Sequence, residues 1–138
     1  MVGIIDLDTV MPGYFMNDFG DMVRSMCNSR DEDAKDIADV FLDLTNFKGI
    51  SDGFLTTMHD IISQEELDSL FVGVRGILYE QFLRFLADYL NGDIYYTVNY
   101  PEHNLDRARV HLKLLIDFQA RENEFIEVLG ESLMQLYK

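Results

Sequence analysis

Residues 63–92 constrain the fold of this 138-residue chain more than any other stretch. The stretch opens with SQEE, a capping-box sequence in which Ser63 caps a helix and Glu66 reaches back to it. It closes with an Asn-Gly pair, as many helices do. Gly73 and Gly76 divide it, and we expect a bend or a close helix contact there. On both sides of these glycines, apolar residues recur at helical spacing: Leu67, Leu70, Phe71, Leu78, Phe82, Phe85, Leu86 and Tyr89.

The same spacing predicts helices in the rest of the chain. We expect a first helix to begin with Asn17 as its cap and to end near residues 28–29. The apolar residues of 47–58 indicate a second helix. Two apolar stripes, in residues 105–116 and 126–136, indicate a final helical region that continues from one stripe into the next.

Little β-structure is expected. Residues 2–7 (VGIIDL) form a short apolar run that is typical of a buried strand. Residues 94–98 are β-prone, and residues 40–44 are expected to be extended. With 48% hydrophobic residues, the chain can bury a core. The sequence therefore predicts a mainly α fold, a single helical domain over residues 1–138 with a short N-terminal strand.

The charge excludes some classes of partner. The net charge is −14, from 25 acidic and 11 basic residues, which argues against nucleic acid and anionic membranes as partners. Six acids lie within residues 31–43, where we expect a solvated loop or helix face.

No apolar run is long enough to span a membrane, and the first residues lack a signal-peptide pattern. A single cysteine, Cys27, lies on an apolar helix face and predicts a buried, inert thiol in a reducing, cytoplasmic setting.

Two acids near the start are the first candidates for chemistry. Asp6 and Asp8 follow an apolar strand, and strand alternation sends both side chains to the same side. Paired carboxylates can hold Mg²⁺ together with phosphate oxygens. Taken alone, two acids at this spacing are more typical of an ordinary loop than of a metal site.

Other residues invite a functional and a structural interpretation. Residues 18–20 spell Asp-Phe-Gly, the metal motif of protein kinases, but here they open a helix, so we expect Asp18 to bond backbone N–H groups. The three histidines show no metal-ligand spacing and are expected to be ordinary. Arg84 could bind phosphate or sugar oxygens. Glu80 lies four residues before it, so a salt bridge on a helix face is the alternative.

Two stretches go beyond such general patterns. The first is residues 5–13 (IDLDTVMPG) followed by residues 17–24 (NDFGDMVR). The second is residues 84–93 (RFLADYLNGD) followed by residues 103–109 (HNLDRAR). In order and spacing, they resemble the C-terminal part of the aminoglycoside phosphotransferase family, and within it the N-acetylhexosamine kinases.

The resemblance implies a fold and a reaction. The fold would be protein-kinase-like, with this chain as part of its C-terminal lobe. The reaction would be transfer of phosphate from ATP, with Mg²⁺, to a sugar or amino sugar. The resemblance makes Asp6 the magnesium-binding aspartate, assisted by Asp8. It implies that Asp18 braces the catalytic loop and that Arg84 contacts the sugar.

The family also has a nucleotide lobe and a catalytic loop of pattern His-x-Asp-x-x-x-x-Asn. His59, His103 and His111 all lack an acid two positions later. We therefore expect the catalytic base, the second metal ligand and the ATP-holding lysine to lie upstream of this chain. The chain would then be a C-terminal fragment without catalytic residues, inactive alone and unable to bind Mg²⁺ or ATP tightly.

An alternative from another functional class is a stand-alone helical interaction module derived from a kinase. Without the nucleotide lobe, apolar surface would be exposed, and large exposed apolar patches mark partner contacts. A homodimer could cover it, with residues 2–7 of two copies pairing as strands. A helical domain with chance motifs is a third interpretation.

Overall fold

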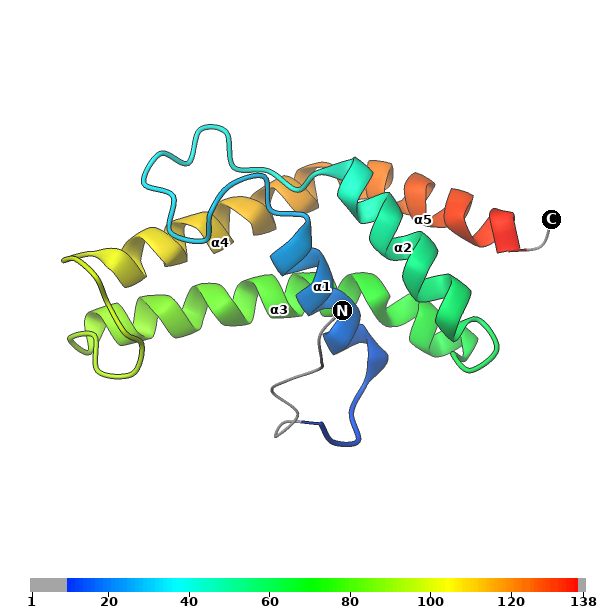
Figure 1. Ribbon diagram of the computed structural model, residues 1–138, viewed down its shortest axis with the longest axis horizontal. Helices are drawn as coiled ribbons and strands as arrows, with labels where there is room; N and C mark the ends of the chain where they lie inside the picture. Colours follow the sequence, from blue (N-terminus) through cyan, green and yellow to red (C-terminus); the bar gives the residue numbers. More distant parts are fainter. Residues whose placement is uncertain (1–9, 137–138) are drawn as a thin grey trace, which may run out of the picture.

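The computed structural model describes residues 10–136 and is built from helices (Figure 1). Within these residues, the only β-structure is an isolated antiparallel bridge between Asn28 and Leu42. The mainly α fold is therefore confirmed, whereas the expected strand at residues 2–7 lies outside the described residues. In chain order, the helices are α1 Phe15–Met26, α2 Leu44–Met58, α3 Gln64–Leu90, α4 His103–Ala120 and α5 Glu122–Leu136.

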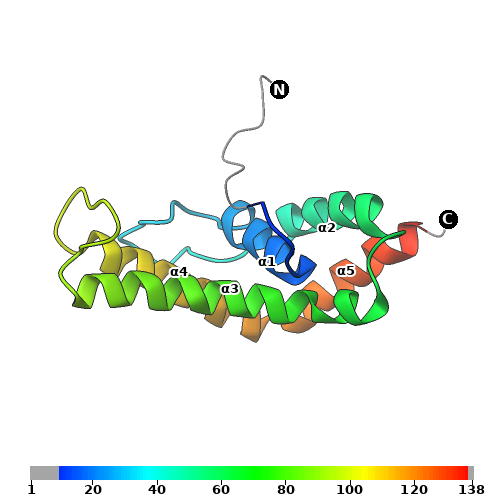
Figure 2. The same cartoon turned by 90° about the horizontal axis from the view of Figure 1, so that it is seen from below.

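The helices form two layers. Helices α3 and α4 run antiparallel along the length of the molecule, and α5 continues from α4 (Figure 1). Helices α1 and α2 lie on one side of that layer (Figure 2). The core lies between the layers and includes Phe19, Phe47, Phe118 and Phe125, all with no exposed surface. Within the described residues, no helix is long and apolar enough to cross a lipid bilayer.

Helix α3 begins as the capping box predicts. The Ser63 hydroxyl accepts a hydrogen bond from Glu66 N at 3.2 Å, and a Glu66 carboxylate oxygen accepts one from Ser63 N at 2.9 Å. The helix then runs for 27 residues. Gly73 does not interrupt the helix, and of the two expectations the close helix contact is confirmed there. After the Asn91 cap, Gly92 takes φ +89° and ends the helix.

Gly73 is where α1 crosses α3. A Cβ atom on Gly73 would lie 1.9 Å from the Met16 carbonyl oxygen of α1. The partner glycine on α1 is Gly20, whose Cβ would lie 2.6 Å from the Gly73 carbonyl oxygen. Helix backbones can approach this closely only where both side chains are missing. The two glycines therefore fix the position of α1 on α3.

The first helix begins earlier than expected. Tyr14 is its N-terminal flanking residue and Phe15 its first residue, so the cap expected at Asn17 is wrong. Asn17 and Asp18 instead lie in the first turn, and both are exposed. The helix ends at Met26, before the expected residues 28–29, because Asn28 has left the helix to pair with Leu42.

The second and last helical regions follow the sequence patterns with shifted ends. Helix α2 starts at Leu44 because the Asp43 carboxylate accepts a hydrogen bond from Asn46 N at 2.8 Å. The expected extended segment 40–44 is reduced to the bridge at Leu42. The last region is two helices separated at Arg121. The Arg121 guanidinium donates to Asp117 at 3.1 Å and to the Leu42 carbonyl at 3.2 Å, which ties the bridge to the end of α4.

Candidate ligand site at the end of α3

The loop after α3 is organised by one buried carboxylate. Asp88, in the last turn of α3, is only 7% exposed. It accepts hydrogen bonds from three consecutive backbone N–H groups, those of Ile94 (3.0 Å), Tyr95 (2.8 Å) and Tyr96 (2.9 Å). Residues 94–98 therefore curl around the carboxylate, and the β-run expected there forms no strand in the described structure.

These contacts also set the charge of Asp88. The Tyr96 N–H bond does most to hold the pKa of the Asp88 carboxyl below its usual value, and the Tyr95, Ile94 and Asn104 donors add to it, while burial opposes the shift. Hydrogen bonds to an ionised carboxylate stabilise that form. Asp88 is therefore an anion at neutral pH, and its ionised carboxylate holds the loop.

Asn104 of α4 fixes the loop from the other side. Its amide donates to Asp88 and to Asp93, both at 2.9 Å. Asp93 and Gly92 both have positive φ, at +57° and +89°, which turns the chain sharply back over the helix end. The end of α3, the loop and the start of α4 are thus joined through neighbouring acid and amide groups.

Arg84 lies one turn before Asp88 and faces the ordered loop. Its guanidinium carbon is 5.6 Å from the centre of the Tyr96 ring and 6.0 Å from that of Tyr95. The expected pair with Glu80 is present at 3.7 Å, between groups that are largely exposed, so it contributes little to stability. The salt bridge and a ligand contact are compatible, because a guanidinium has five N–H donors.

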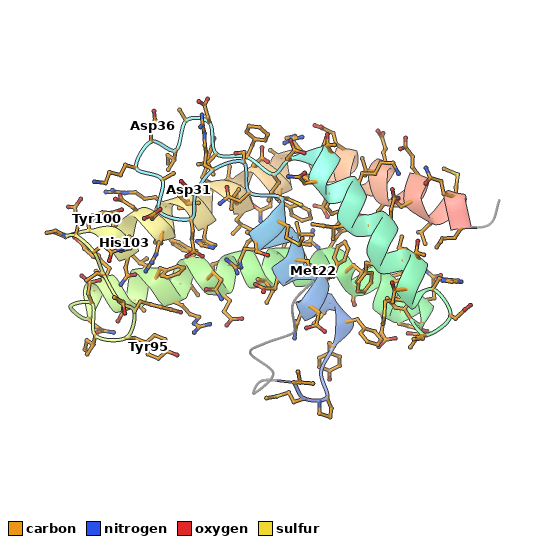
Figure 3. All side chains as sticks on the ribbon, in the orientation of Figure 1. Met22, Asp31, Asp36, Tyr95, Tyr100 and His103 are labelled. Carbon is orange, nitrogen blue, oxygen red and sulfur yellow. The ribbon has the colours of Figure 1, made fainter. Side chains whose placement is uncertain are left out.

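Beside these groups is an open cavity of about 440 Å³. Tyr95 is 76% exposed and extends from the loop beyond α3 (Figure 3). The cavity combines aromatic rings, a guanidinium and an amide, which is the mixture of ring surface and directed polar groups that holds small polar ligands. Its lining residues are Arg84, Ala87, Asp88, Asn91, Tyr95 and Tyr96.

The structure brings only one of the predicted site residues to this cavity. Arg84 lines it. Asp18 lies on α1, which crosses α3 about three turns away at Gly73, and no side-chain hydrogen bond of Asp18 is found in the described residues. The helix-capping role expected for Asp18 is therefore wrong. Asp6 and Asp8 lie outside the described residues, and within residues 10–136 no group of three or more His, Cys, Asp or Glu side chains could hold a metal ion.

Sequence reasoning missed Asp88, although a signal existed. An acid in the last turn of a helix opposes the helix dipole, so an aspartate just before an Asn-Gly terminus needs compensating donors. The missing information was the path of residues 94–96, since their free N–H groups supply those donors. Propensity alone predicted an extended run there.

Two histidines of α4 are buried and hydrogen-bonded. His103 accepts from Asn99 N at its Nδ1, so its Nε2 carries the proton and donates to Asp33 at 3.0 Å. His111 donates from Nδ1 to the Arg107 carbonyl at 2.8 Å, which leaves Nε2 as an acceptor. Burial lowers the pKa of His111, so its ring is neutral at pH 7.

The acidic segment 31–43 is a largely exposed loop, which is one of the two expected alternatives. Its Glu32 and Asp33 side chains also contact basic and histidine side chains of α1 and α4. Asp33 contacts both Tyr100 and His103, which Figure 3 labels together with Asp31 and Asp36 of this segment. These partners are 8 to 79 residues away in sequence, so no local sequence pattern predicts the contacts. Cys27 is buried as predicted, and burial raises its pKa to about 12.

No protein-family model matches the chain.

Proposed function

We propose that this chain is the acceptor-binding, C-terminal part of an ATP-dependent phosphotransferase that resembles the aminoglycoside phosphotransferase family. A sugar or amino sugar is the proposed acceptor, held in the cavity beside Arg84. The observation that carries the proposal is the cavity itself, because residues 84–93, which bear part of the resemblance, supply four of its six lining residues, and Asn104 of the second stretch holds one of these, Asp88. The helical architecture suits a kinase-like C-terminal lobe.

The cavity chemistry suits a polyhydroxylated ligand. The exposed Tyr95 ring offers a flat apolar surface for the C–H face of a sugar, and the Arg84 guanidinium offers donors to hydroxyl oxygens. Asp88 is occupied by four hydrogen bonds, so its role is to hold Tyr95 and Tyr96 in place. We assign it as a positioning residue.

Transfer of phosphate needs groups that these 138 residues do not provide. In the proposal, Asp6 and Asp8 hold Mg²⁺ of Mg²⁺-ATP, which neutralises phosphate charge. The base for the acceptor hydroxyl, the second metal ligand and the ATP-holding lysine come from outside this chain. The chain alone therefore binds the acceptor without phosphorylating it.

A two-part experiment tests the proposal. The 138-residue chain is titrated with N-acetylglucosamine and N-acetylgalactosamine while NMR follows the side chains of Arg84 and Tyr95. We expect both residues to shift in the wild type. Arg84→Gln should abolish the Tyr95 shift, whereas Arg109→Gln, which changes an exposed arginine outside the cavity, should leave the shifts unchanged. Equal titration of both variants, or no shift with either sugar, would contradict the acceptor site.

The second part measures phosphorylation. With Mg²⁺-ATP and the bound sugar, the chain alone should form no sugar phosphate. If the reading frame upstream encodes His-x-Asp-x-x-x-x-Asn, the longer protein should be active and lose activity on Asp6→Ala. Turnover by the 138 residues alone would refute the missing-base argument.

An interaction module remains the second candidate function, because one face of α3 is apolar and exposed. Val72 and Tyr79 are each 52% exposed and Leu83 is 42% exposed, at spacings that place them on one stripe. A second copy of the chain could cover this stripe. Sedimentation velocity decides: a monomer at all concentrations tested contradicts self-association.

A further inference from the structure

A second cluster of charged side chains lies between α1, α4 and the acidic segment. Glu32 is at its centre. Its carboxylate accepts a hydrogen bond from Arg24 of α1 at 3.0 Å and lies 3.7 Å from both Arg107 Nε and His111 Nε2 of α4. Arg24 is further held by Asp21 at 2.7 Å and faces His111 Nε2 at 3.4 Å. One carboxylate thus serves two guanidinium groups.

The Glu32 carboxylate does not satisfy every hydrogen-bond donor of this cluster. Arg107 Nε is buried and has no hydrogen-bond partner among residues 10–136, since 3.7 Å to Glu32 is beyond bonding distance. The Tyr96 hydroxyl is also buried without a partner. A buried polar group without a partner is destabilising and rare, so each calls for an explanation.

The side chains that carry the two unpartnered atoms both pack against Phe85. The Arg107 guanidinium lies 5.3 Å from the centre of the Phe85 ring, and the Tyr96 ring lies 4.6 Å from that centre. The remaining Arg107 donor bonds go to Asn104 at 3.1 Å and to the Thr97 carbonyl at 3.4 Å, so its side chain is fixed. Two buried polar groups here, Arg107 Nε and the Tyr96 hydroxyl, therefore lack a hydrogen-bond partner among the described residues.

An open cavity of about 320 Å³ adjoins the cluster. Arg24, Glu32 and His111 line it, together with Arg30, Asp31, Ser25 and Asn28. The segment that carries Glu32 has no helix or strand between the bridge residues Asn28 and Leu42. Glu32 is also 41% exposed, so its side chain can leave without unpacking a core residue.

We propose that this cluster is a phosphate-binding site in which the Glu32 carboxylate is the resident anion, and that a phosphate group of a ligand replaces it. A phosphate offers more acceptor oxygens than a carboxylate, enough for Arg24, Arg107 Nε and the Tyr96 hydroxyl together. The guanidinium group pairs well with phosphate. The adjoining cavity takes the rest of the phosphorylated ligand.

This inference does not rest on the proposed function. The cavity beside Arg84 and the Glu32 cluster use different ligand contacts, and either proposal can fail alone. The net charge of −14 opposes anions at long range, so binding is tested near 0.15 M salt, where charges are screened over about 8 Å. The phosphate affinity measured at this salt concentration then depends mainly on the hydrogen-bond donors of the cluster itself.

The test compares inorganic phosphate binding by the intact chain and by Glu32→Gln. Calorimetry gives affinity, and NMR of the arginine Nε–H groups reports Arg107 directly. We expect Glu32→Gln to bind phosphate at least tenfold more tightly than wild type and the Arg107 Nε–H signal to shift. Glu127→Gln, the same charge change on an exposed site of α5, should bind as wild type does.

Two further arms separate the explanations. Arg24→Gln in the Glu32→Gln background should remove the gain, with circular dichroism verifying that the helices persist. If that variant does not fold, Arg24→Lys, which keeps the charge and loses the fork, should weaken binding instead. Acetate should bind more weakly than phosphate. Equal gains from Glu32→Gln and Glu127→Gln, or equal affinity for acetate and phosphate, would overturn the proposal.

Discussion

The crossing of α1 over α3 gives the most direct test of the packing, through Gly73→Ala. A Cβ atom there would lie 1.9 Å from the Met16 carbonyl oxygen, 2.5 Å from its carbonyl carbon and 2.8 Å from its Cβ. Ordinary carbon–oxygen contacts start at about 3.3 Å. Two of the three clashing atoms are backbone, so no side-chain rotation relieves them, and α1 must move by on the order of 1 Å.

Two effects of opposite sign set the magnitude. Alanine in place of glycine inside a helix gains about 1 kcal/mol. Inserting a methyl group into a packed contact costs about 1–3 kcal/mol, and more where the backbone must shift. Because the clash is with backbone, we expect a net loss of about 2 kcal/mol in the free energy of unfolding. For a chain of this size, that lowers Tm by roughly 8 °C.

The same helix provides the matched control. Gly76 is one turn along α3, and a Cβ there would meet nothing within 4 Å. Gly76→Ala should therefore stabilise the chain by about 0.5–1 kcal/mol through helix propensity alone. Urea unfolding followed by helical circular dichroism measures both. If Gly73→Ala is as stable as Gly76→Ala, the close crossing of α1 and α3 is refuted.

Two further predictions concern ionisable groups. The pKa of Asp88 is lowered in the folded state, so its stabilisation is complete above the usual aspartate pKa of about 3.9 and is lost as pH falls through the folded pKa. Wild type should therefore unfold at a higher urea concentration than Asp88→Asn at pH 7 and lose that advantage below about pH 4. A difference between the two proteins that does not change with pH would contradict this. Burial raises the pKa of Cys27 to about 12, so a thiol reagent at pH 8 should label it slowly in the folded chain and rapidly in urea, whereas fast labelling of the folded chain would contradict its burial.

Local signals predicted the helices because their causes are local. The capping box at Ser63 and the glycine at position 92 operate within one turn, and both occur in the structure. Apolar spacing predicted α2 despite Gly49 and Gly53, which face open space and cost only propensity. Packing of the apolar face against α1 and α5 outweighs that cost.

Errors arose where a distant segment decides the local structure. At Gly73 the sequence left a bend and a close helix contact open, and only the position of Met16 shows that the contact is present. Residues 94–98 were a β-prone run, but Asp88 takes three of their N–H groups. The end of α1 depends on Leu42, which draws Asn28 out of the helix. Such partners cannot be read from residue type or spacing.

The candidate site, like the fold, could be predicted only in part from the sequence. Arg84 was assigned from its residue type and the resemblance, and it lines a cavity. The aromatic side of that cavity was not foreseen, because Tyr95 and Tyr96 reach Arg84 only after the loop has wrapped around Asp88. The acids of residues 31–43 were predicted to face solvent. The partners of Glu32 and Asp33 come from α1 and α4, so their contacts could not be foreseen.

Phe85 contacts residues of both proposed binding sites. Its ring packs on Tyr96 at 4.6 Å, toward the Arg84 cavity, and on His111 at 5.3 Å, toward the Glu32 cluster. Tyr96 belongs to both, since its ring faces Arg84 and its hydroxyl is one of the unpartnered atoms. A phosphate that engages this hydroxyl would restrain the ring beside the other cavity. Binding at the two sites should therefore be coupled through Tyr96, and Tyr96→Phe, which keeps the ring and removes the hydroxyl, should lower phosphate affinity and uncouple them.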